Sequence, residues 1–512
     1  MMAQTGLLPA ITLAELLPGT WLPSAVGAVV VSGLCLDHRK LVEGDLFIAM
    51  PGTKHDGRRY INDAIKLGAI AILKTPDSEA DTISWQGEVP IIPFPLLEEK
   101  VSEIAGNFFS DPSKLMNVVG VTGTNGKSTV THLLAQLHQL TDSNAGVVGT
   151  LGFGMMNQLG NDVDDLVETG LTTADPIATQ QILAELKDKG AVVVAMEVSS
   201  HSLQQHRVDA VDFEAAIFTN LTRDHLDYHG DMESYGRAKQ RLLVRSELSH
   251  CVVNFDDEYG RRFATKISPE KSKPNTKLWT YSIRDSKAAV YAKEIHLDAK
   301  GISAYVVTPW GEGQLRSSLL GEFNLSNLLA VLTTFCAQGG KFKSALEQME
   351  KLKPVAGRME IIRGSVDFSI VVDYAHTSDS LIHVLKALRA HTEGRLWCLF
   401  GCGGDRDRGK RPLMAKAAEE FADVVIVTSD NPRSESLITI NEDIRAGFKK
   451  PENVTFFDDR AMAIKYCLEN AAKGDCVLIA GKGHENYQLI GDNRLPFSDA
   501  KQARLALREL GV

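Results

Sequence analysis

One glycine-rich stretch combines the residue types that bind a phosphate chain, and it reads Gly120-Val121-Thr122-Gly123-Thr124-Asn125-Gly126-Lys127-Ser128-Thr129. An apolar run precedes it and a helical pattern of leucines follows, which predicts a strand, a tight turn and a helix. Backbone N–H groups of such a turn point into a hollow where phosphate oxygens are stabilised. Lys127 is expected to reach the terminal phosphates, and Ser128 to ligate magnesium. The stretch predicts a nucleoside triphosphate site, although Val121 stands where such loops usually carry their first glycine.

Two further strands in the central part of the chain end in polar residues. The apolar run 191–196 leads to Glu197, and the run 215–218 leads to a polar segment that contains His225. Because ligands of open parallel sheets bind at the carboxyl ends of strands, both side chains are expected near the nucleotide. A carboxylate at a strand end can instead cap the next helix, and a single histidine is often structural. Three polar strand exits in one sheet favour a site for a nucleotide and its metal ion.

The last third of the chain repeats the same form four times. Apolar runs at 370–372, 396–400, 424–427 and 477–480 each lead into a polar loop. This pattern predicts a parallel sheet whose edge carries Asp, Arg, Asn and Glu side chains. The unit is similar in outline to a dinucleotide-binding sheet, but it lacks the G-x-G-x-x-G pattern, so no NAD site is expected.

Length and composition limit the kind of protein. With 512 residues the chain is too long for one core, and we expect domains at 1–112, 113–356 and 357–512. A net charge of −10 argues against broad nucleic-acid binding. The seven cysteines include no C-x-x-C pair, which disfavours a zinc knuckle or a disulfide framework. No secretory pattern and no membrane-spanning run is present, so we expect a cytoplasmic protein without membrane insertion.

The first of these domains has an α/β pattern and one basic loop. A β-rich run at 29–36 and a strand at 44–49 precede a helical stretch and a buried strand at 69–73. The loop 51–59 is polar and basic. It is suited to an anionic ligand such as a diphosphate, but the same composition is common in solvated turns.

Together these motifs resemble the Mur ligase family, the ATP-dependent amide-forming enzymes of peptidoglycan precursor synthesis. The resemblance follows the family's order over essentially the whole chain. The matching segments are Gly123-Thr124-Asn125-Gly126-Lys127, Glu197-Val198-Ser199-Ser200-His201, Asn220-Leu221-Thr222-Arg223-Asp224-His225-Leu226-Asp227, Gly321-Glu322-Phe323-Asn324, Gly357-Arg358-Met359-Glu360 and Asp373-Tyr374-Ala375-His376. Asp430-Asn431-Pro432-Arg433 and Gly481-Lys482-Gly483-His484-Glu485 are similar to segments of those members that add meso-diaminopimelate to UDP-N-acetylmuramoyl-L-alanyl-D-glutamate.

The resemblance implies an α/β fold of three domains. These are a UDP-N-acetylmuramoyl-dipeptide-binding N-terminal domain, a central P-loop ATPase-type domain with a parallel sheet, and a C-terminal Rossmann-like domain that binds the amino acid. The implied reaction moves the γ-phosphate of ATP onto a substrate carboxylate, and an amine of diaminopimelate then displaces phosphate from the acyl phosphate. Such transfer depends mostly on positioning and on charge neutralisation.

The resemblance also implies roles for individual residues. The catalytic group would be Lys127, Glu197, His225 and Lys239. Two magnesium ions would be held by Ser128, Glu197, His225 and by Lys239 as its carbamate, N6-carboxylysine. ATP would contact residues 123–129 together with Asn324, Arg358, Asp373 and His376. The UDP-sugar peptide would contact Asp37, Arg39, Thr53, Lys54, His55, Thr172, Thr173, Ser199, Gln205 and Arg207. The amino acid would contact Arg406, Asp430, Asn431, Pro432, Arg433, Gly481 and Glu485.

Substrate choice has a direct physical argument. Diaminopimelate differs from lysine by a carboxylate at its far end, and an Arg fork pairs bidentately with a carboxylate but repels an ammonium. Arg433 is the expected fork, assisted by Asn431 and Arg406, while Glu485 is expected to meet the distal amine. Two alternatives stay open: a ligase of the same mechanism that adds lysine or extends folate, and a nucleotide-dependent switch that forms no bond. We expect a monomer and no nucleic-acid partner.

Overall fold

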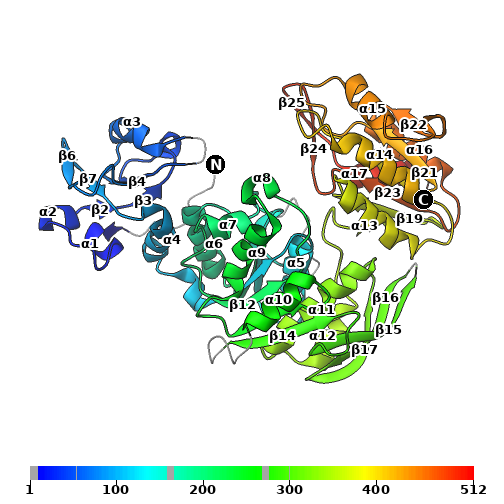
Figure 1. Ribbon diagram of the computed structural model, residues 1–512, viewed down its shortest axis with the longest axis horizontal. Coiled ribbons are helices and arrows are strands. Elements are labelled where there is room, and N and C mark those ends of the chain that lie inside the picture. Colours follow the sequence, from blue (N-terminus) through cyan, green and yellow to red (C-terminus); the bar gives the residue numbers. More distant parts are fainter. Residues whose placement is uncertain (1–9, 53–54, 158–165, 268–275, 299, 512) are drawn as a thin grey trace.

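The chain folds into three units, each built around a β-sheet of its own (Figure 1). The computed structural model describes residues 10–52, 55–157, 166–267, 276–298 and 300–511. In Figure 1 the N-terminal and C-terminal units lie on opposite sides of the central unit. The domain limits expected at 112 and 356 fall between these sheets and remain predictions.

The N-terminal unit contains a five-stranded sheet in the order β3-β4-β5-β7-β6. The first four of these strands run parallel, and the fifth is antiparallel to its neighbour. Its strands are β1 (Ile11–Thr12), β2 (Val30–Val31), β3 (Gly33–Cys35), β4 (Asp45–Ala49), β5 (Ala71–Lys74), β6 (Ser84–Gln86) and β7 (Val89–Pro93). Its helices are α1 (Leu13–Leu16), α2 (Ser24–Gly27), α3 (Ile61–Lys66) and α4 (Leu97–Phe108), with 3-10 turns at His38–Lys40, Gly57–Tyr60 and Pro112–Leu115.

Residues 29–36 do not form the single extended run that the sequence predicts. β2 pairs with β1, whereas β3 belongs to the five-stranded sheet. The break falls at Ser32, whose backbone N–H donates to the carbonyl oxygen of Gly44 at 3.1 Å. A Cβ on Gly44, which has φ +91°, would lie 2.3 Å from Ser32 Oγ. Close packing of two backbone segments therefore divides the run, and strand propensity alone does not show it.

The central unit contains a ten-stranded sheet in the order β10-β9-β11-β8-β12-β13-β14-β15-β16-β17. Its middle strands are parallel, and antiparallel strands occupy both edges. The strands are β8 (Asn117–Thr122), β9 (Ala145–Gly149), β10 (Gly152–Met155), β11 (Val193–Glu197), β12 (Phe213–Phe218), β13 (His250–Asn254), β14 (Lys277–Ser282), β15 (Val290–Asp298), β16 (Gly301–Thr308) and β17 (Gly311–Ser317). The helices are α5 (Lys127–Leu140), α6 (Pro176–Asp188), α7 (Ser200–Gln204), α8 (Leu226–His229), α9 (Met232–Leu243), α10 (Glu258–Ile267), α11 (Glu322–Ala337) and α12 (Phe342–Met349).

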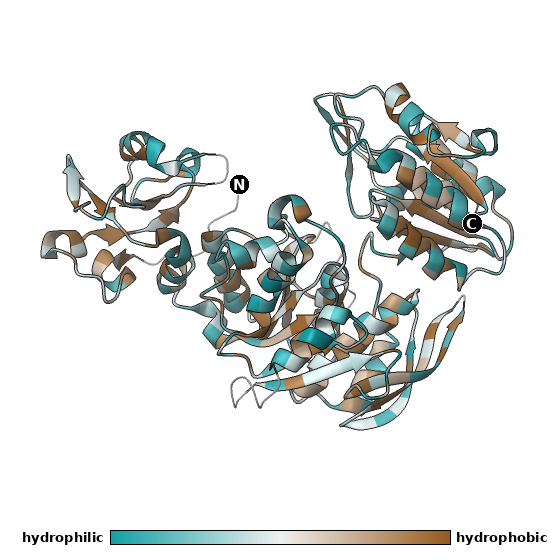
Figure 2. Ribbon diagram, in the orientation of Figure 1, coloured by the Kyte–Doolittle hydropathy of each residue, from teal (hydrophilic) through white to brown (hydrophobic). Residues whose placement is uncertain are grey.

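Helices cover both faces of the central sheet, which explains why its strands are continuous apolar runs. Val119 and Val121 of β8 pack in one core with residues of α5 and α11, while Val118 packs in a second core with residues of α6, α9 and α10. Figure 2 shows apolar strands between helices whose surfaces are mostly polar. The sheet therefore has only its strand ends available for a polar site.

The C-terminal unit contains a six-stranded sheet in the order β18-β19-β23-β20-β21-β22. The four strands expected from the sequence are parallel, and a short parallel strand and a short antiparallel strand extend the two edges. The strands are β18 (Glu360–Ile361), β19 (Ser369–Asp373), β20 (Leu396–Phe400), β21 (Val424–Thr428), β22 (Thr455–Phe457) and β23 (Cys476–Ala480), and a hairpin follows, β24 (Tyr487–Ile490) and β25 (Asn493–Pro496). The helices are α13 (Ser378–Arg389), α14 (Lys410–Phe421), α15 (Leu437–Arg445), α16 (Arg460–Asn470) and α17 (Asp499–Glu509), with a 3-10 turn at Pro451–Asn453.

Several smaller features complete the architecture. His391 joins the central and C-terminal units, because its Nε2 accepts from the Gly321 N–H at 2.9 Å and its Nδ1 donates to the carbonyl oxygen of Asp298 at 2.6 Å. All seven cysteines are buried free thiols. Within the described ranges, no helix combines the length and apolar character needed to cross a bilayer.

Candidate active site

The phosphate loop lies between β8 and α5, and the exit of β12 holds it in place. Thr124 N donates to the carbonyl oxygen of Asn220 at 2.8 Å, and Asn125 N donates to Asn220 Oδ1 at 2.9 Å. Thr219 Oγ1 in turn donates to the carbonyl oxygen of Asn125 at 2.6 Å. The loop residues 123–129 expected to bind ATP are therefore fixed by the neighbouring strand exit.

Two glycines of this loop have no room for a side chain. Gly123 has φ +151° and Gly126 has φ +87°, a region that L-residues rarely adopt. A Cβ on Gly123 would lie 1.8 Å from Thr219 Oγ1, and one on Gly126 would lie 2.6 Å from Asn327 Oδ1. Val121 lies inside β8 and is buried, so the position that carries the first glycine in other phosphate loops here belongs to the strand.

Two lysine amines converge on the loop. Lys127 Nζ donates to the carbonyl oxygens of Gly123 and Thr124 at 3.1 and 2.9 Å, and Lys239 Nζ of α9 donates to the same Gly123 oxygen at 2.7 Å. Burial lowers the pKa of both amines; the charge of Arg358 adds to the shift of Lys127, and the charge of Lys127 adds to the shift of Lys239. Lysines on helices are usually solvated, but Lys239 is 1% exposed. Among the described residues, neither amine forms an ion pair with a carboxylate.

Glu197 is the last residue of β11 and is buried beside the loop's sheet. Its Oε1 accepts from Thr150 N at 2.9 Å and its Oε2 accepts from Thr150 Oγ1 at 3.2 Å. It does not cap the following helix, because Ser199 does so by accepting from Ser202 N at 3.0 Å. Glu197 also stabilises the charged form of Lys127 through space. The carboxylate is thus held by neutral donors within the field of the phosphate-loop amine.

His225 immediately precedes α8 and has an unusual backbone conformation. Its φ is +53°, and its half-exposed side chain places Nε2 3.3 Å from Asp224 Oδ2. The imidazole lies edge-on to His201, with 5.0 Å between ring centroids, and 6.1 Å from the ring of Tyr235. A non-glycine residue in this region costs about 1–3 kcal/mol, which the structure around it must offset. Such strain is common at functional sites.

The described residues contain no cluster of three His, Cys, Asp or Glu side chains that could hold a metal ion. The magnesium ligands expected from the sequence are not a cluster of that type, because they include the Ser128 hydroxyl and a modified lysine. Ser128 and Glu197 are oxygen donors, which magnesium prefers. Ser128 is 7% exposed, and it lies in the first turn of α5, beside the loop. These oxygen donors fit magnesium.

The residues expected to contact the rest of ATP lie where the central and C-terminal units meet. Asn324 of α11 is buried and accepts from Asn327 Nδ2 at 3.1 Å, next to Gly126 of the loop. The guanidinium of Arg358 lies 4.6 Å from the Tyr374 ring centroid. Arg358 also destabilises the charge of Lys127, so the two cations lie within electrostatic reach of one another.

Asp373 is the last residue of β19, and His376 lies in the loop that follows this strand. Both carboxylate oxygens of Asp373 accept backbone N–H groups at 2.8 Å, one from Met359 and one from Ala375. Burial nevertheless raises the pKa of Asp373, although Arg358 opposes the shift. His376 Nδ1 donates to the carbonyl oxygen of Tyr374 at 2.8 Å, which leaves its Nε2 as the acceptor.

The residues expected to hold the sugar peptide form a chain of contacts that reaches Glu197. Thr173 Oγ1 donates to the Glu197 carbonyl oxygen at 2.9 Å and accepts from Ser199 N at 3.1 Å. Arg207 Nη1 donates to the Thr173 carbonyl oxygen at 2.9 Å, and its Nε donates to Gln205 Oε1 at 3.0 Å. The remaining member, Thr172, has its hydroxyl oxygen 3.1 Å from Thr150 Oγ1.

The expected uridine diphosphate contacts lie in the N-terminal unit. Asp37 Oδ1 accepts from Arg39 N at 3.2 Å, and Arg39 Nη2 lies 2.7 Å from Asp37 Oδ2. The hydrogen bonds from Arg39 lower the pKa of Asp37 to about 2. His55 is exposed, and Thr53 and Lys54 lie outside the described residues.

The expected amino-acid contacts lie in the loops after β20, β21 and β23. Asn431 Nδ2 donates to Glu485 Oε2 at 2.8 Å, and Arg433 Nη1 donates to the Gly404 carbonyl oxygen at 2.8 Å. Gly481 N donates to the Asp373 carbonyl oxygen at 3.0 Å, which connects this edge to the ATP side. The other members are Asp430, which is buried, Pro432, and Arg406, whose Nη1 donates to the Asp405 carbonyl oxygen at 3.1 Å.

Sequence reasoning missed two residues that hold the site together. Thr150 directly follows β9 and donates to Glu197. The sequence feature that could have identified it is its place as a polar residue at the end of another apolar strand. Lys482 is 0% exposed and donates to Glu485 Oε2 at 2.9 Å. The sequence shows Lys482 between two glycines of a motif, but it does not show that the side chain is buried.

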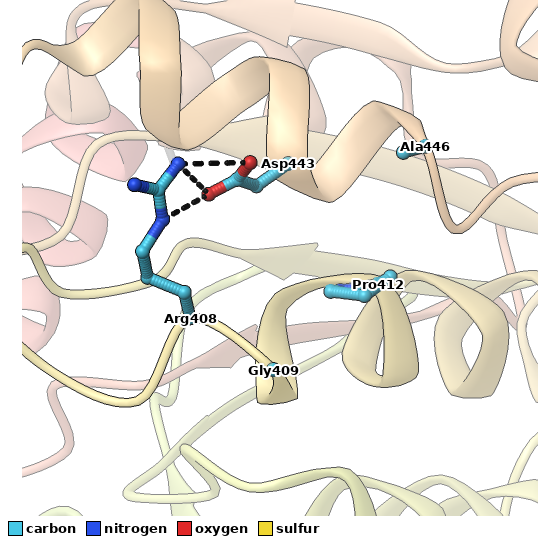
Figure 3. A pocket seen from close by; sticks show the side chains of 5 residues that line it. All are labelled: Arg408, Gly409, Pro412, Asp443 and Ala446. Atoms are coloured by element: carbon cyan, nitrogen blue, oxygen red, sulfur yellow. Dashed lines mark hydrogen bonds and ion pairs between the residues drawn. The ribbon is translucent and has the colours of Figure 1, made fainter.

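A separate cavity of about 280 Å³ lies between α14 and α15 (Figure 3). Arg408 pairs with Asp443 across it, with Nε and Nη2 at 3.0 and 3.2 Å from the two carboxylate oxygens. None of the residues predicted for the site lines this cavity, so it is not part of the candidate active site. Its lining residues are Arg408, Gly409, Pro412, Asp443 and Ala446.

A phosphate loop at the centre of a parallel sheet, with a second polar sheet edge on the following unit, defines a multidomain P-loop α/β enzyme. Three family models match in chain order: the Mur ligase family catalytic domain at 30–109, the Mur ligase middle domain at 121–335, and the Mur ligase glutamate ligase domain at 357–483. The chain belongs to the Mur ligase family, which confirms the family and the three-domain α/β fold expected from the motifs.

Similar proteins match over nearly the full length. UDP-N-acetylmuramoyl-L-alanyl-D-glutamate--2,6-diaminopimelate ligase of Coxiella burnetii is 47% identical, over 94% of this chain and 96% of its own. The protein of the same name from Ectopseudomonas mendocina is 48% identical, over 95% of this chain and 97% of its own. A solved structure, also of a UDP-N-acetylmuramoyl-L-alanyl-D-glutamate--2,6-diaminopimelate ligase, has a TM-score of 0.73 and 34% identity, and covers 98% of this chain and 100% of that one.

Proposed function

We propose that this enzyme adds meso-diaminopimelate to UDP-N-acetylmuramoyl-L-alanyl-D-glutamate, using ATP and releasing ADP and phosphate. The observation that carries the proposal is the convergence of the Lys127 and Lys239 amines on one carbonyl oxygen of the phosphate loop. The Lys127 amine has no carboxylate partner among the described residues, so its charge suits a polyanionic ligand, and the buried Lys239 amine lies beside it on the same carbonyl oxygen. The names of the most similar proteins support the choice of substrates.

The proposed reaction has two steps. An oxygen of the substrate carboxylate forms a bond to the γ-phosphorus as the bond to ADP breaks, and an amine then attacks the acyl carbon and expels phosphate. Lys127 neutralises the oxygens of the transferring group, and the backbone N–H groups of residues 123–129 orient it. The attacking nitrogen needs its lone pair, so it must reach the acyl carbon unprotonated, and after the attack it loses a further proton to the departing phosphate or to solvent.

Magnesium is part of this proposal. Ser128 and Glu197 would hold one ion, and His225 with the carbamate of Lys239 a second, and bound magnesium would supply charge neutralisation to the phosphates. Burial that lowers the pKa of Lys239 also favours the neutral amine that carbon dioxide needs for carbamate formation. Thr150 holds Glu197 through two hydrogen bonds, so the carboxylate stays oriented.

Arg433 is proposed as the group that selects diaminopimelate. Within the described part of the chain its side chain donates to the carbonyl oxygens of Gly404 and Asn431 and to no carboxylate, so its charge is available to the distal carboxylate of the amino acid. Lysine has no group at that end for a guanidinium to bind. We therefore propose diaminopimelate over lysine, with the lysine-adding reaction as the alternative outcome of the test.

The test is phosphate release from the purified protein with ATP, magnesium and UDP-N-acetylmuramoyl-L-alanyl-D-glutamate. Three reactions are compared, with meso-diaminopimelate, with L-lysine and with no amino acid, and the product mass is recorded. We expect release with diaminopimelate only, and a product heavier by that residue. Release with lysine alone would contradict the role of Arg433. ATP turnover without either amino acid, stimulated by a protein partner, would support a nucleotide switch.

We further propose that the enzyme acts as a monomer in the cytoplasm. Seven buried free thiols and no disulfide suit a reducing compartment. Size-exclusion chromatography with light scattering tests the monomer, for which the expected mass is 55.9 kDa.

A further inference from the structure

Lys482 occupies the interior of the amino-acid edge, between the loops that follow β21 and β23. Its ammonium donates to Asn431 Oδ1 at 3.1 Å and to Glu485 Oε2 at 2.9 Å, and it lies 3.8 Å from Asp430 Oδ1. The side chain is 0% exposed, whereas lysine is almost never fully buried unless it is paired. Three of the residues expected to contact the amino acid therefore share one buried cation.

This contact fixes which way the Asn431 amide points. Asn431 Oδ1 accepts two hydrogen bonds, from Lys482 Nζ and from Leu489 N at 2.9 Å. Because both partners are donors, the oxygen must lie on that side, and Nδ2 must lie on the other side, where it donates to Glu485 Oε2 at 2.8 Å. Without the ammonium, one of the two donors that define this orientation is lost.

The same contact fixes Glu485. Its Oε2 accepts from both Lys482 and Asn431, and among the described residues no hydrogen bond is recorded for its Oε1. One oxygen is thus used to hold the carboxylate and the other is left for a ligand. The ammonium also separates Glu485 from Asp430, so that two carboxylates can share this edge without direct repulsion.

We propose that Lys482 is a positioning residue that orients Asn431 and Glu485 and thereby sets selectivity for an amino acid with an amine and a carboxylate at its far end. This inference rests on the proposed function. Lys482 lies on the interior side of its two partners, so it acts through them and not by contact with the amino acid. Its loss is expected to weaken recognition of the amino acid and to leave nucleotide binding intact.

The experiment compares Lys482→Met and Lys482→Arg with wild type in the ligation assay. We expect Lys482→Met to raise the KM for diaminopimelate by about 30-fold, with KM for ATP and for the UDP-dipeptide changed by less than about threefold. The preference for diaminopimelate over lysine, as a ratio of kcat/KM values, should fall by about 10-fold. Lys482→Arg, which keeps the charge and the donors, should recover part of both. Lys465→Met, on an exposed pair with Glu509, is the matched control.

A second comparison keeps the proposal testable if Lys482→Met folds poorly. The double variant Lys482→Met with Glu485→Gln removes the Glu485 charge together with the ammonium, so Glu485 is not left as an unpaired carboxylate. If the two residues act as one unit, its KM for diaminopimelate should equal that of Glu485→Gln alone within about threefold. Additive losses, or an unchanged KM and selectivity in Lys482→Met, would overturn the positioning role. An inactive wild type would instead refute the proposed function, so the two failures are distinct.

Discussion

The phosphate-loop site and the C-terminal unit stabilise their buried charges in different ways. Around the phosphate loop the partners are neutral: carbonyl oxygens for Lys127 and Lys239, and Thr150 for Glu197. In the C-terminal unit, fully buried Arg460 pairs with Asp499 at 2.7 Å, and fully buried Arg411 pairs with Glu435 at 2.9 Å. At the phosphate loop, positive charge is not neutralised by a carboxylate of the described residues and is available to a ligand. In the C-terminal unit each buried guanidinium is paired with a carboxylate, and these ion pairs stabilise the fold.

The same distinction operates inside the C-terminal unit. Arg460 also donates to the carbonyl oxygens of Ser429, which directly follows β21, and of Ala480, which ends β23, so it contacts the start of both amino-acid loops. Arg433, in contrast, donates only to the carbonyl oxygens of Gly404 and Asn431 among the residues that the structure describes. A buried ion pair broken on one side is costly, so paired charges are suited to structure. A charge held only by neutral partners, such as that of Arg433, is available to a ligand, and we expect its substitution to affect binding more than stability.

The largest effect is expected at the phosphate loop. Lys127→Ala should lower kcat by about 1,000-fold or more, because the transferring phosphoryl group loses its main positive neighbour. The unfolding midpoint should stay close to that of wild type or rise, since removal of a desolvated amine costs no ion pair. Phosphate release and thermal unfolding measure the two quantities. Lys187→Ala, on the exposed end of α6, is the control. Activity within about 10-fold of wild type would contradict the assignment.

A smaller effect is expected at the amino-acid edge. Arg433→Ala should raise the KM for diaminopimelate by about 100-fold, while ADP binding measured by calorimetry remains unchanged. Arg433→Lys should recover little, because an ammonium cannot form the bidentate contact. Arg408→Ala breaks an ion pair with Asp443 at the surface of the same unit and should leave the KM unaltered. Steady-state kinetics with diaminopimelate that match wild type would exclude Arg433 as the fork.

The sequence predicted well which polar residues lie at the ends of the strands. It predicted poorly which groups those residues contact. Continuous apolar runs identify parallel strands buried on both faces, and the residue that follows each run lies at the sheet edge, as Glu197 and Asp373 do. The burial of Lys239 could not be read from its helix, since it depends on the loop that α9 packs against. Lys482 likewise depends on two loops that are 51 residues apart in the chain. Long-range packing of this kind leaves no local pattern.

A further test concerns the neutral partner of Glu197. Thr150→Ala removes the hydroxyl that donates to Oε2 at 3.2 Å but keeps the backbone N–H that donates to Oε1. We expect kcat/KM to fall by about 10-fold and the magnesium concentration for half-maximal rate to rise. Thr150→Ser retains the hydroxyl and should behave like wild type. Equal magnesium dependence in all three proteins would show that Thr150 does not position the carboxylate.

The smallest effect concerns the pH dependence of stability. Buried histidines of the central unit whose partners are uncharged should make this unit less stable in acid. His138 of α5 lies 3.3 Å from Gln338 Oε1, and burial lowers its pKa from 6.5 to about 4. Between these values the unfolded chain binds a proton that the folded chain does not, so stability falls as pH decreases through this window. Each such group contributes at most about 1.4 kcal/mol per pH unit.

His138→Gln removes one of these groups and should flatten the fall in unfolding midpoint between pH 6.5 and pH 4.5, since glutamine does not titrate. Because His132 and His484 also have pKa values lowered to about 4 by burial, the slope should decrease but not vanish. His383→Gln, at an exposed position on α13, should leave the slope as it is. If the unfolding midpoint of both variants falls with pH as steeply as that of wild type, the acid sensitivity does not arise from His138. A buried group with a neutral partner on α5 would then not make stability depend on pH.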